Sequence, residues 1–380
     1  MKFLKQLEIN IRNYINAKFN DTSNVEIVTE PVDILEKIHN PKILLLRQDK
    51  IGDIIISTPV FKALREQYPN AEIHVLYGES NFNAKHISNE FGIKPLLLKK
   101  GFWSTISLLQ QLRKEHYDCI VDLIDNTSTT SSLITKYAKS TYAVGFLKDN
   151  AAVYTHVVPL PDRSVHHIID VIAELLTPFG INPHEIHLAP SYPINEADIQ
   201  RNQQLFSQAT KKVTCFINIS GSVKERYWGT DHFIQLIQKI QSDAPETDVF
   251  VGSSPEYNTQ AQQIVQATGA NRVQPNISFH EYATLIHDAD IFISPDTSLI
   301  HVASAFNTPT VGLFQHYNLD RMPWYPYNTL HCSCTVTADK HFQDISVEEI
   351  FDSFMALYEE VHHDEGVELA QEPVGQQEEN

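Results

Sequence analysis

Residues 42–63, KILLLRQDKIGDIIISTPVFKA, decide the fold, because an apolar strand runs directly into a polar loop and then into a helix. Residues 43–46 are all aliphatic, which is typical of a strand buried on both faces of a parallel sheet. The loop holds Gly52 and Asp53. Because ligands of open parallel sheets bind beyond the carboxyl ends of the strands, this segment is expected to place a carboxylate at a binding cleft.

The second half of the chain contains a similar junction at residues 290–314, DIFISPDTSLIHVASAFNTPTVGLF. Its apolar strand ends at Asp296, Thr297 and Ser298, where a helix is predicted to start at once. Two such junctions indicate two doubly wound α/β domains that face each other across a cleft. The length of 380 residues agrees with this division, since chains beyond ~250–300 residues usually split into domains.

Apolar runs alternate with helical patterns through both halves, which predicts parallel sheets. The expected strands are residues 43–46, 73–77, 119–123, 214–219, 248–252, 290–294 and 310–314. Helices are expected at residues 59–68, 164–179 and 346–362, the last with a capping box from Ser346 to Glu349. Prolines at 183, 190 and 193 mark a linker. The predicted organisation is a lead-in at 1–40, domains at 41–190 and 191–345, a helix at 346–362 and a tail at 363–380.

The composition is that of a globular protein, with 42% hydrophobic and 20% charged residues. No apolar run approaches the roughly 18 residues of a membrane-spanning helix, and the amino-terminal segment lacks the features of a secretory signal. We therefore expect a cytoplasmic protein. The net charge of -18 argues against a nucleic-acid partner, because such a partner needs a basic surface.

The two ends of the chain differ in charge. Residues 1–20 have a basic amphipathic pattern, which predicts a helix that packs on its own domain or makes peripheral contact with an anionic membrane surface. Residues 359–380 are rich in Asp and Glu and contain no Lys or Arg. This composition predicts a disordered acidic tail from residue 363.

Two long segments resemble glycosyltransferase family 9, the lipopolysaccharide heptosyltransferase family. Residues 47–76 follow the family pattern R-x-D-x-x-G-D-x-x-x-x-x-P, and residues 289–314 follow D-T-G-x-x-H-x-A-A except that Ser298 replaces the glycine and Ser304 the last alanine. Weaker matches at 117–126, 143–146 and 217–228 occur in the family's order. The resemblance implies a GT-B fold, in which the first Rossmann-like domain binds mainly the acceptor and the second mainly the nucleotide sugar.

Asp53, which follows Gly52 in the family motif, is the expected catalytic base of an inverting transfer. A carboxylate suits the removal of the acceptor hydroxyl's proton while the anomeric carbon gains oxocarbenium character. The structural alternative is that Asp53 only caps the following turn, a common use of Asp in loops. The resemblance also implies that Gly52 contributes to binding of the nucleotide sugar.

The start of the second-half helix is expected to stabilise the leaving nucleoside diphosphate. Thr297, Ser298 and Leu299 occupy this helix start, where free N–H groups and the helix dipole favour an anion. Asp296 is expected to bind a sugar or ribose hydroxyl rather than the phosphates. His301 matches the family histidine and is expected to donate to a phosphate. The side chain of Ser298 narrows the approach of a phosphate to the backbone.

The segment SGSVKERYW, residues 220–228, follows another predicted strand and offers cations and hydroxyls to a phosphate. Arg226 takes the family's usual basic position before Trp228 and is the favoured donor-binding cation. Lys224 and Ser220 are further binding candidates, for which an ordinary surface loop is the alternative. No D-x-D signature occurs at a suitable strand end, so we expect a metal-independent transfer without a cofactor.

Two of the four cysteines, Cys332 and Cys334, lie near His331 and His341 and raise the question of a metal site. The C-x-C spacing is atypical for structural zinc. Cys119 and Cys215 are far away in sequence, and four scattered cysteines do not form a disulfide framework. Free thiols are therefore expected.

These observations favour a transferase that moves heptose from ADP-heptose to a lipopolysaccharide core or another surface glycan in a Gram-negative bacterium. A protein acceptor or a UDP-sugar donor remains an alternative within the family. A nucleotide-sugar 2-epimerase of the same architecture remains a second alternative, and a non-catalytic nucleotide-sugar-binding protein a third. Epimerisation needs no acceptor, so product analysis separates a transferase from an epimerase.

Overall fold

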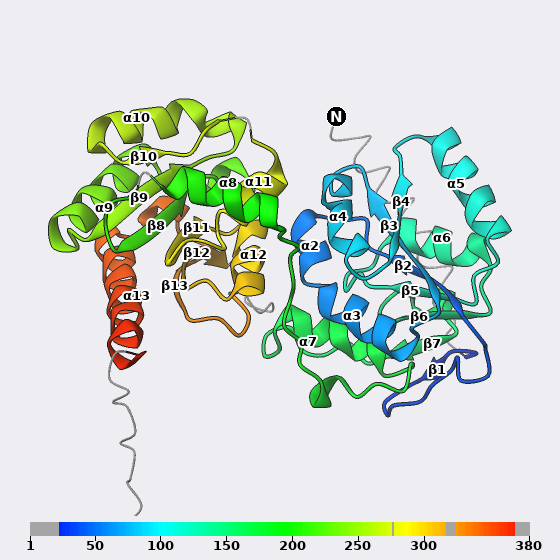
Figure 1. Ribbon diagram of the computed structural model, residues 1–380. Coiled ribbons are helices and arrows are strands. Elements are labelled where there is room, and N and C mark those ends of the chain that lie inside the picture. Colours follow the sequence, from blue (N-terminus) through cyan, green and yellow to red (C-terminus); the bar gives the residue numbers. More distant parts are fainter. Residues whose placement is uncertain (1–22, 208, 276, 317–323, 369–380) are drawn as a thin grey trace, which may run out of the picture. The chain divides into compact units, whose positions relative to one another are not determined.

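The computed structural model describes residues 23–207, 209–275, 277–316 and 324–368 (Figure 1). The amphipathic helix predicted for residues 1–20 and the tail beyond residue 368 lie outside these residues. The chain forms two compact units. Unit 1 holds the described residues up to Pro193 together with residues 324–327, and unit 2 holds the others.

Unit 1 is built on a seven-stranded parallel sheet with the order β1-β7-β6-β5-β2-β3-β4. The strands are β1 Glu26–Ile27, β2 Lys42–Leu46, β3 Glu72–Gly78, β4 Lys94–Leu98, β5 Cys119–Asp122, β6 Tyr142–Phe146 and β7 His156–Val158. The helices are α2 Ile51–Ile55, α3 Thr58–Gln67, α4 Lys85–Asn89, α5 Phe102–Lys114, α6 Thr129–Ala138 and α7 Ile168–Ala173. Pro59 stands in the first turn of α3, where its missing N–H has no cost.

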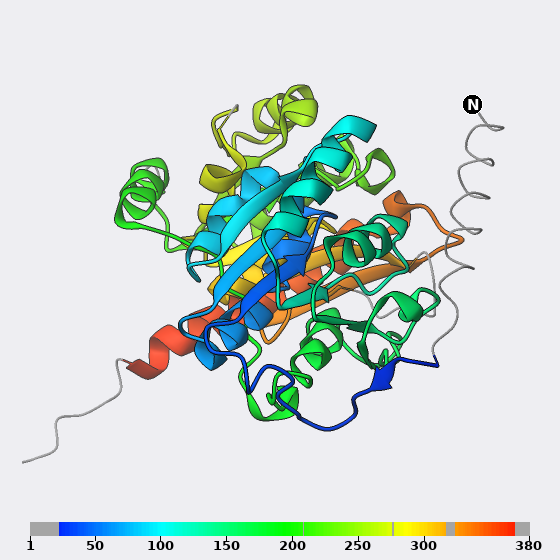
Figure 2. The same cartoon turned by 90° about the vertical axis from the view of Figure 1, so that its right-hand side faces the viewer.

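Helices cover both faces of this sheet (Figures 1 and 2). Successive residues of β2 point to opposite faces, so Leu44 and Leu46 pack with Leu108 and Leu112 of α5 and with Ile134 of α6. The helices α3, α4 and α7 lie on the other side, where α3 contacts both α4 and α7. Both faces of the sheet are therefore covered by helices, which explains why the sequence of β2 is a continuous apolar run.

Unit 2 is built on a six-stranded parallel sheet with the order β10-β9-β8-β11-β12-β13. The strands are β8 Val213–Asn218, β9 Thr247–Gly252, β10 Asn271–Arg272, β11 Ile291–Pro295, β12 Thr310–His316 and β13 His331–Thr337. The helices are α8 Glu196–Phe206, α9 Thr230–Asp243, α10 Asn258–Thr268, α11 Phe279–Thr284, α12 Ser298–Phe306 and α13 Val347–Glu368. Ser278 starts α11 with a capping box to Glu281.

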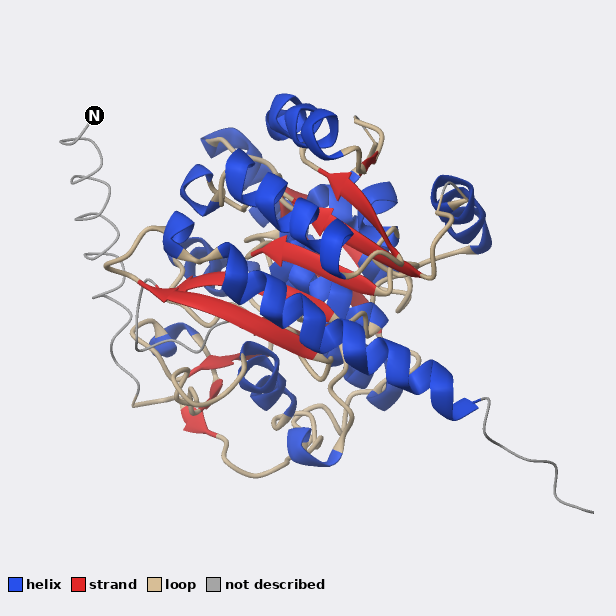
Figure 3. Ribbon diagram, turned by 90° about the vertical axis from the view of Figure 1, so that its left-hand side faces the viewer, coloured by secondary structure: helices blue, strands red, loops and turns tan. Residues whose placement is uncertain are grey.

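The sheet of unit 2 also has a helix layer on each face (Figure 3). On one face, Phe233 of α9, Ile264 of α10 and Phe354 of α13 belong to a single core cluster. On the other face, Phe206 of α8 packs against Phe250 of β9 at a ring distance of 4.8 Å. The prediction of two doubly wound parallel-sheet domains is confirmed. The cleft between the domains stays a prediction.

Both sheets have the same strand order when each is numbered from its first central strand. In unit 1 the series β4-β3-β2-β5-β6-β7, and in unit 2 the series β10-β9-β8-β11-β12-β13, follows the order 3-2-1-4-5-6. In this topology the order in which strands are added to the sheet reverses between strands 1 and 4, and ligands bind in the crevice at that switch point. The loops after β2 and β5 meet there in unit 1, and the loops after β8 and β11 meet there in unit 2.

Three predicted boundaries need correction. The helix expected at 164–179 begins at Ile168, because His167 caps it by accepting the N–H of Ile169 through Nδ1, and it continues as a 3-10 turn over Glu174–Leu176. The carboxy-terminal helix ends at Glu368 rather than at residue 362, so the first residues assigned to the tail are helical. Ser346 caps its start as expected, accepting the N–H of Glu349 at 3.1 Å.

The third correction concerns residues 324–327, which were assigned to the second domain but belong to unit 1. The ring Nε2 of His167 donates to the carbonyl of Tyr325 at 2.9 Å. The hydroxyl of Tyr327 donates to the carboxylate of Asp170 at 2.5 Å. These bonds fasten the segment to α7, a partner that is distant in sequence.

The four cysteines are free thiols, as expected. Cys332 and Cys334 lie two residues apart on β13, so both face the same core cluster. Burial raises the pKa of the Cys334 thiol to about 11. Within the described ranges no group of three or more His, Cys, Asp or Glu is arranged to hold a metal ion. None of the described helices has the length and apolar character needed to cross a membrane.

Candidate functional site

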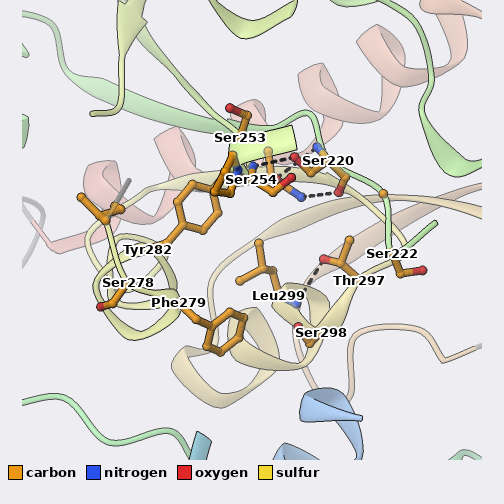
Figure 4. Close-up of a pocket in the computed structure, with 14 residues that line it drawn as sticks. Ser220, Ser222, Ser253, Ser254, Ser278, Phe279, Tyr282, Thr297, Ser298 and Leu299 are labelled. Carbon is orange, nitrogen blue, oxygen red and sulfur yellow. Dashed lines mark hydrogen bonds between the residues drawn. The ribbon is translucent and has the colours of Figure 1, made fainter. Parts of the chain in front are cut away.

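A cavity of about 400 Å³ opens at the switch point of unit 2 (Figure 4). Its volume falls in the roughly 300–1,000 Å³ range of small-molecule sites. Seven of the 14 lining residues are serine or threonine, and the others include two aromatic rings and several apolar groups. The lining residues are Asn218, Ser220, Gly221, Ser222, Ser253, Ser254, Pro255, Ile277, Ser278, Phe279, Tyr282, Thr297, Ser298 and Leu299.

One wall of this cavity is the amino terminus of α12, a helix start that the sequence predicted at these residues. Thr297 is the N-cap residue, and its Oγ1 accepts the N–H of Leu299 at 3.2 Å. Thr297, Ser298 and Leu299 all line the cavity (Figure 4). The first turn of α12 contains no acidic residue. The positive end of the helix dipole therefore faces the cavity without a compensating carboxylate in that turn.

Asn218, the last residue of β8, is another lining residue and holds the neighbouring loops in place. Its amide donates to the carbonyl of Ser220 and to Ser294 Oγ, both at 2.9 Å, and its Oδ1 accepts the hydroxyl of Tyr282 at 2.9 Å. Ser220 Oγ in turn accepts the N–H of Ser254 at 2.8 Å. This chain of bonds holds the loops after β8 and β9 in one arrangement with α11.

Gly252 makes this arrangement possible at the end of β9. A Cβ atom there would lie 2.4 Å from Tyr282 Oη and 2.7 Å from the ring of Phe216. Only glycine therefore allows the Tyr282 ring to lie across β9 and to reach Asn218. Burial raises the pKa of Tyr282, which keeps its hydroxyl protonated as a hydrogen-bond donor.

Arg226 and Asp296 form an ion pair beside the cavity, with 2.7 Å between Arg226 Nη1 and Asp296 Oδ2. Arg226 Nη1 also donates to Ser222 Oγ, a lining atom, at 2.7 Å. A Cβ at position 221 would come within 2.6 Å of the Arg226 carbonyl, so Gly221 permits this tight loop. The sequence named both charged residues, but the pairing is a property of the fold. The pairing offsets the negative charge of Asp296, which would otherwise repel a diphosphate.

Two of the predicted donor residues are placed differently. Lys224 is 81% exposed and pairs with Glu256 at 3.2 Å on the surface, so the structure does not bring it to the cavity. This placement agrees with the surface alternative for Lys224, and its part in donor binding stays a prediction. His301 is 4% exposed inside α12 and does not line the cavity. Its contact with a phosphate stays a prediction.

Several lining residues were missed from the sequence. Ser253 and Ser254 follow β9 directly, so the rule that ligands bind beyond the carboxyl ends of strands was sufficient to find them. Ser278, Phe279 and Tyr282 come from the start of α11. No local signal marks these three residues, because only the packing of α11 on the sheet brings them to the cavity.

The switch point of unit 1 holds Asp53, but in a different setting from the predicted loop. Asp53 lies inside the short helix α2, where its Oδ2 accepts the N–H of Lys50 at 2.8 Å. The capping role named as the alternative is therefore present. Its Oδ1 lies 3.7 Å from Nη2 of Arg47, and its carbonyl accepts Arg47 Nε at 2.9 Å. Gly52 is buried in the same helix, in unit 1, whereas the serine-lined cavity belongs to unit 2.

Arg47 joins the two loops that meet at this switch point. It is 1% exposed, and its Nη1 donates to the carbonyl of Leu123, just after β5, at 2.8 Å. Asn81 holds the same loop from the end of β3, donating to the carbonyl of Arg47 at 2.9 Å. A second cavity, of about 340 Å³, opens beside the loop and is lined by Gln48, Asp49, Ile124, Asn126, Thr127, Ser128, Thr129 and Thr130.

Two Rossmann-like domains, each with polar side chains at its topological switch point, define the GT-B class of proteins. A model of glycosyltransferase family 9 (heptosyltransferase) matches residues 105–351, and the chain belongs to this family. The sequence resemblance and the expectation of a transferase enzyme are thereby confirmed. The matched range begins after the segment that contains Asp53.

Individual relatives agree with this assignment. The chain is similar to lipopolysaccharide heptosyltransferase 3 of Escherichia coli, with 24% identity over 302 residues, covering 73% of this chain and 84% of the relative. The glycosyl transferase family 9 structure from Veillonella parvula DSM 2008 superposes with a TM-score of 0.71 at 17% identity, covering 88% of this chain and 99% of that chain. The E. coli ADP-heptose lps heptosyltransferase II gives 0.67 at 17% identity, covering 85% and 99%.

Proposed function

We propose that this protein is an inverting heptosyltransferase that transfers heptose from ADP-heptose to a lipopolysaccharide core acceptor. The observation that carries the proposal is the hydroxyl-lined cavity at the switch point of unit 2, bounded by the amino terminus of α12 and by the Arg226–Asp296 pair. The donor and acceptor are those named for similar proteins of the family. Because such an acceptor is a glycolipid, we place the reaction at the cytoplasmic face of the inner membrane of a Gram-negative bacterium.

The donor fits the cavity by its chemistry. The diphosphate is assigned to the amino terminus of α12, where Thr297, Ser298 and Leu299 offer backbone N–H groups. Arg226 supplies the positive charge beside it. Phe279 and Tyr282 provide aromatic faces at the α11 side of the cavity, suited to packing against a base or a sugar ring (Figure 4).

Asp53 is assigned as the general base of the transfer. The acceptor oxygen forms a bond to the anomeric carbon, the bond from that carbon to the diphosphate breaks, and the acceptor proton passes to the Asp53 carboxylate. Attack from the side opposite the leaving group inverts the configuration. Arg226 and the α12 dipole stabilise the charge that develops on the leaving ADP, as a metal ion does in other transferases. We therefore propose that transfer needs no metal.

The test is a calorimetric titration of the full chain with ADP-heptose, ADP, UDP-glucose and UDP-N-acetylglucosamine in EDTA, followed by transfer to a truncated lipopolysaccharide core. Tighter binding of ADP-heptose than of either UDP-sugar, with a β-to-α or α-to-β change at the anomeric carbon of the product, supports the proposal. Selectivity for a UDP-sugar contradicts the donor assignment. Turnover of the nucleotide sugar without an acceptor, giving its epimer, contradicts the transferase mechanism.

A further inference from the structure

Four carboxylates surround the buried Arg47 at the switch point of unit 1. Asp49 and Asp53 follow β2, and Asp122 and Asp125 lie at the end of β5. Burial opposes the charge of Arg47, but these four carboxylates together raise its pKa above the usual value. Arg47 therefore stays cationic and organises the cluster.

Two of the four carboxylates have a cation of their own. Asp122 pairs with Lys148 at 3.3 Å and also accepts the hydroxyl of Tyr154 at 2.5 Å. Asp125 pairs with Arg163 at 2.5 Å. The cations that the structure describes at these two positions leave Arg47 to balance the remaining pair, Asp49 and Asp53.

Arg47 contacts both members of that remaining pair. Its Nη1 lies 3.5 Å from Asp49 Oδ2, and its Nη2 lies 3.7 Å from Asp53 Oδ1. Nη2 has no hydrogen-bond partner, although the side chain is 1% exposed. The single positive charge of Arg47 thus has to balance the negative charges of both Asp49 and Asp53. One carboxylate of the cluster is therefore left without a balancing cation among the described residues.

Asp49 is the carboxylate whose negative charge is least well balanced. Its Oδ1 is buried and has no hydrogen-bond partner, whereas Asp53 Oδ2 accepts the N–H of Lys50. The side chain of Asp49 is 29% exposed, so its burial is partial. This partial burial raises the pKa of Asp49 to about 6; Arg47 opposes the rise, and the negative charges of Asp53 and Asp122 add to it. Asp49 also lines the polar cavity beside Gln48 and Asn126, so protons from solvent reach it through that cavity.

We propose that Asp49 is a positioning residue of the transfer reaction, which shares Arg47 with Asp53 and by its ionisation keeps Asp53 basic enough to accept the proton of the acceptor. This inference rests on the proposed function. When Asp49 is ionised, its negative charge opposes the ionised form of Asp53 and raises the proton affinity of that base. When Asp49 is protonated, Arg47 balances Asp53 alone and that proton affinity falls.

The consequence is an acid limb in the pH dependence of kcat. The rate falls as the pH decreases through about 6, the range in which Asp49 takes up its proton. Asp49→Asn imitates the protonated side chain with almost no change of shape. We expect its kcat at pH 8 to be about 10-fold lower, since a general base contributes 10²–10⁴-fold and this base is weakened rather than removed. KM for ADP-heptose is expected to stay unchanged, because the donor residues belong to unit 2.

The experiment compares kcat between pH 5 and 9 for the full-length wild type, Asp49→Asn, Asp49→Glu and Glu66→Gln, with ADP-heptose and a truncated lipopolysaccharide core. Glu66→Gln is the control, because it removes an exposed negative charge from the same unit. We expect the acid limb to vanish in Asp49→Asn, and to persist in Asp49→Glu and in the control. A profile of Asp49→Asn that superposes on that of the wild type overturns the proposal.

A second measurement separates this inference from the proposed function. Carbon-detected NMR titration of the full-length protein follows the Asp53 carboxylate in the wild type and in Asp49→Asn. A lower pKa of Asp53 in the variant supports the coupling, and an unchanged pKa of Asp53 overturns it. If the wild type transfers no heptose, the proposed function fails, while the titration still decides whether Asp49 controls Asp53.

Discussion

Arg226→Ala tests the donor site most directly. Arg226 and Asp296 are 19% and 24% exposed, and 2.7 Å separates their charged atoms, so the pair is partly shielded from solvent. Hydrogen bonds to charged groups contribute about 1.5–3 kcal/mol, which predicts a loss of ADP affinity of roughly 10- to 150-fold when Arg226 is removed. The loss belongs in the upper part of that range, because the negative charge of Asp296 then faces the diphosphate without Arg226.

The assay is calorimetric titration with ADP in EDTA, and the chain offers a matched control. Lys224 belongs to the same 3-10 turn, Lys224–Arg226, but pairs with Glu256 on the surface, so Lys224→Ala is expected to change the affinity less than about 2-fold. The double variant Arg226→Ala/Asp296→Asn should recover part of the loss, since it also removes the repulsive charge. ADP binding to Arg226→Ala within about 2-fold of the wild-type affinity would refute this assignment of the diphosphate.

Three further outcomes are expected. Asp53→Asn should lower kcat by about 10²–10⁴-fold with little change in ADP affinity, measured by transfer assay and calorimetry; wild-type turnover rules out Asp53 as the base. Gly252→Ala should lower the free energy of unfolding by about 1–3 kcal/mol in urea, because its Cβ collides with the Tyr282 ring; equal stability means that the ring moves freely. Asp49→Asn should melt at a higher temperature than the wild type at pH 8 but not at pH 4. The raised pKa of Asp49 means that its ionised form destabilises the fold, fully so above about pH 6, and this destabilisation disappears when Asp49 is protonated at lower pH. A lower melting temperature of Asp49→Asn at pH 8 contradicts the conclusion that the ionised Asp49 destabilises the fold.

The sequence by itself determined the class of fold and the two segments that build the sites. Each buried strand is a continuous apolar run because both of its faces are covered, so β2, β8 and β11 were located within a residue or two. The strand-to-helix junction at Thr297 is also encoded locally, because an N-cap bond joins residues that are neighbours in the chain.

Only the tertiary structure decided which of these residues act together. Arg226 meets Asp296 and Arg47 meets Leu123 across neighbouring strands, and such pairs leave no periodic trace in the sequence. Tyr282 could not be found from the sequence for the same reason, because it reaches Asn218 from a helix 64 residues away. Lys224 was predicted as a ligand because the sequence does not show that it pairs with Glu256 on the surface. Hydrophobic periodicity records which face of an element is buried, whereas the partner of a polar side chain depends on how distant elements pack.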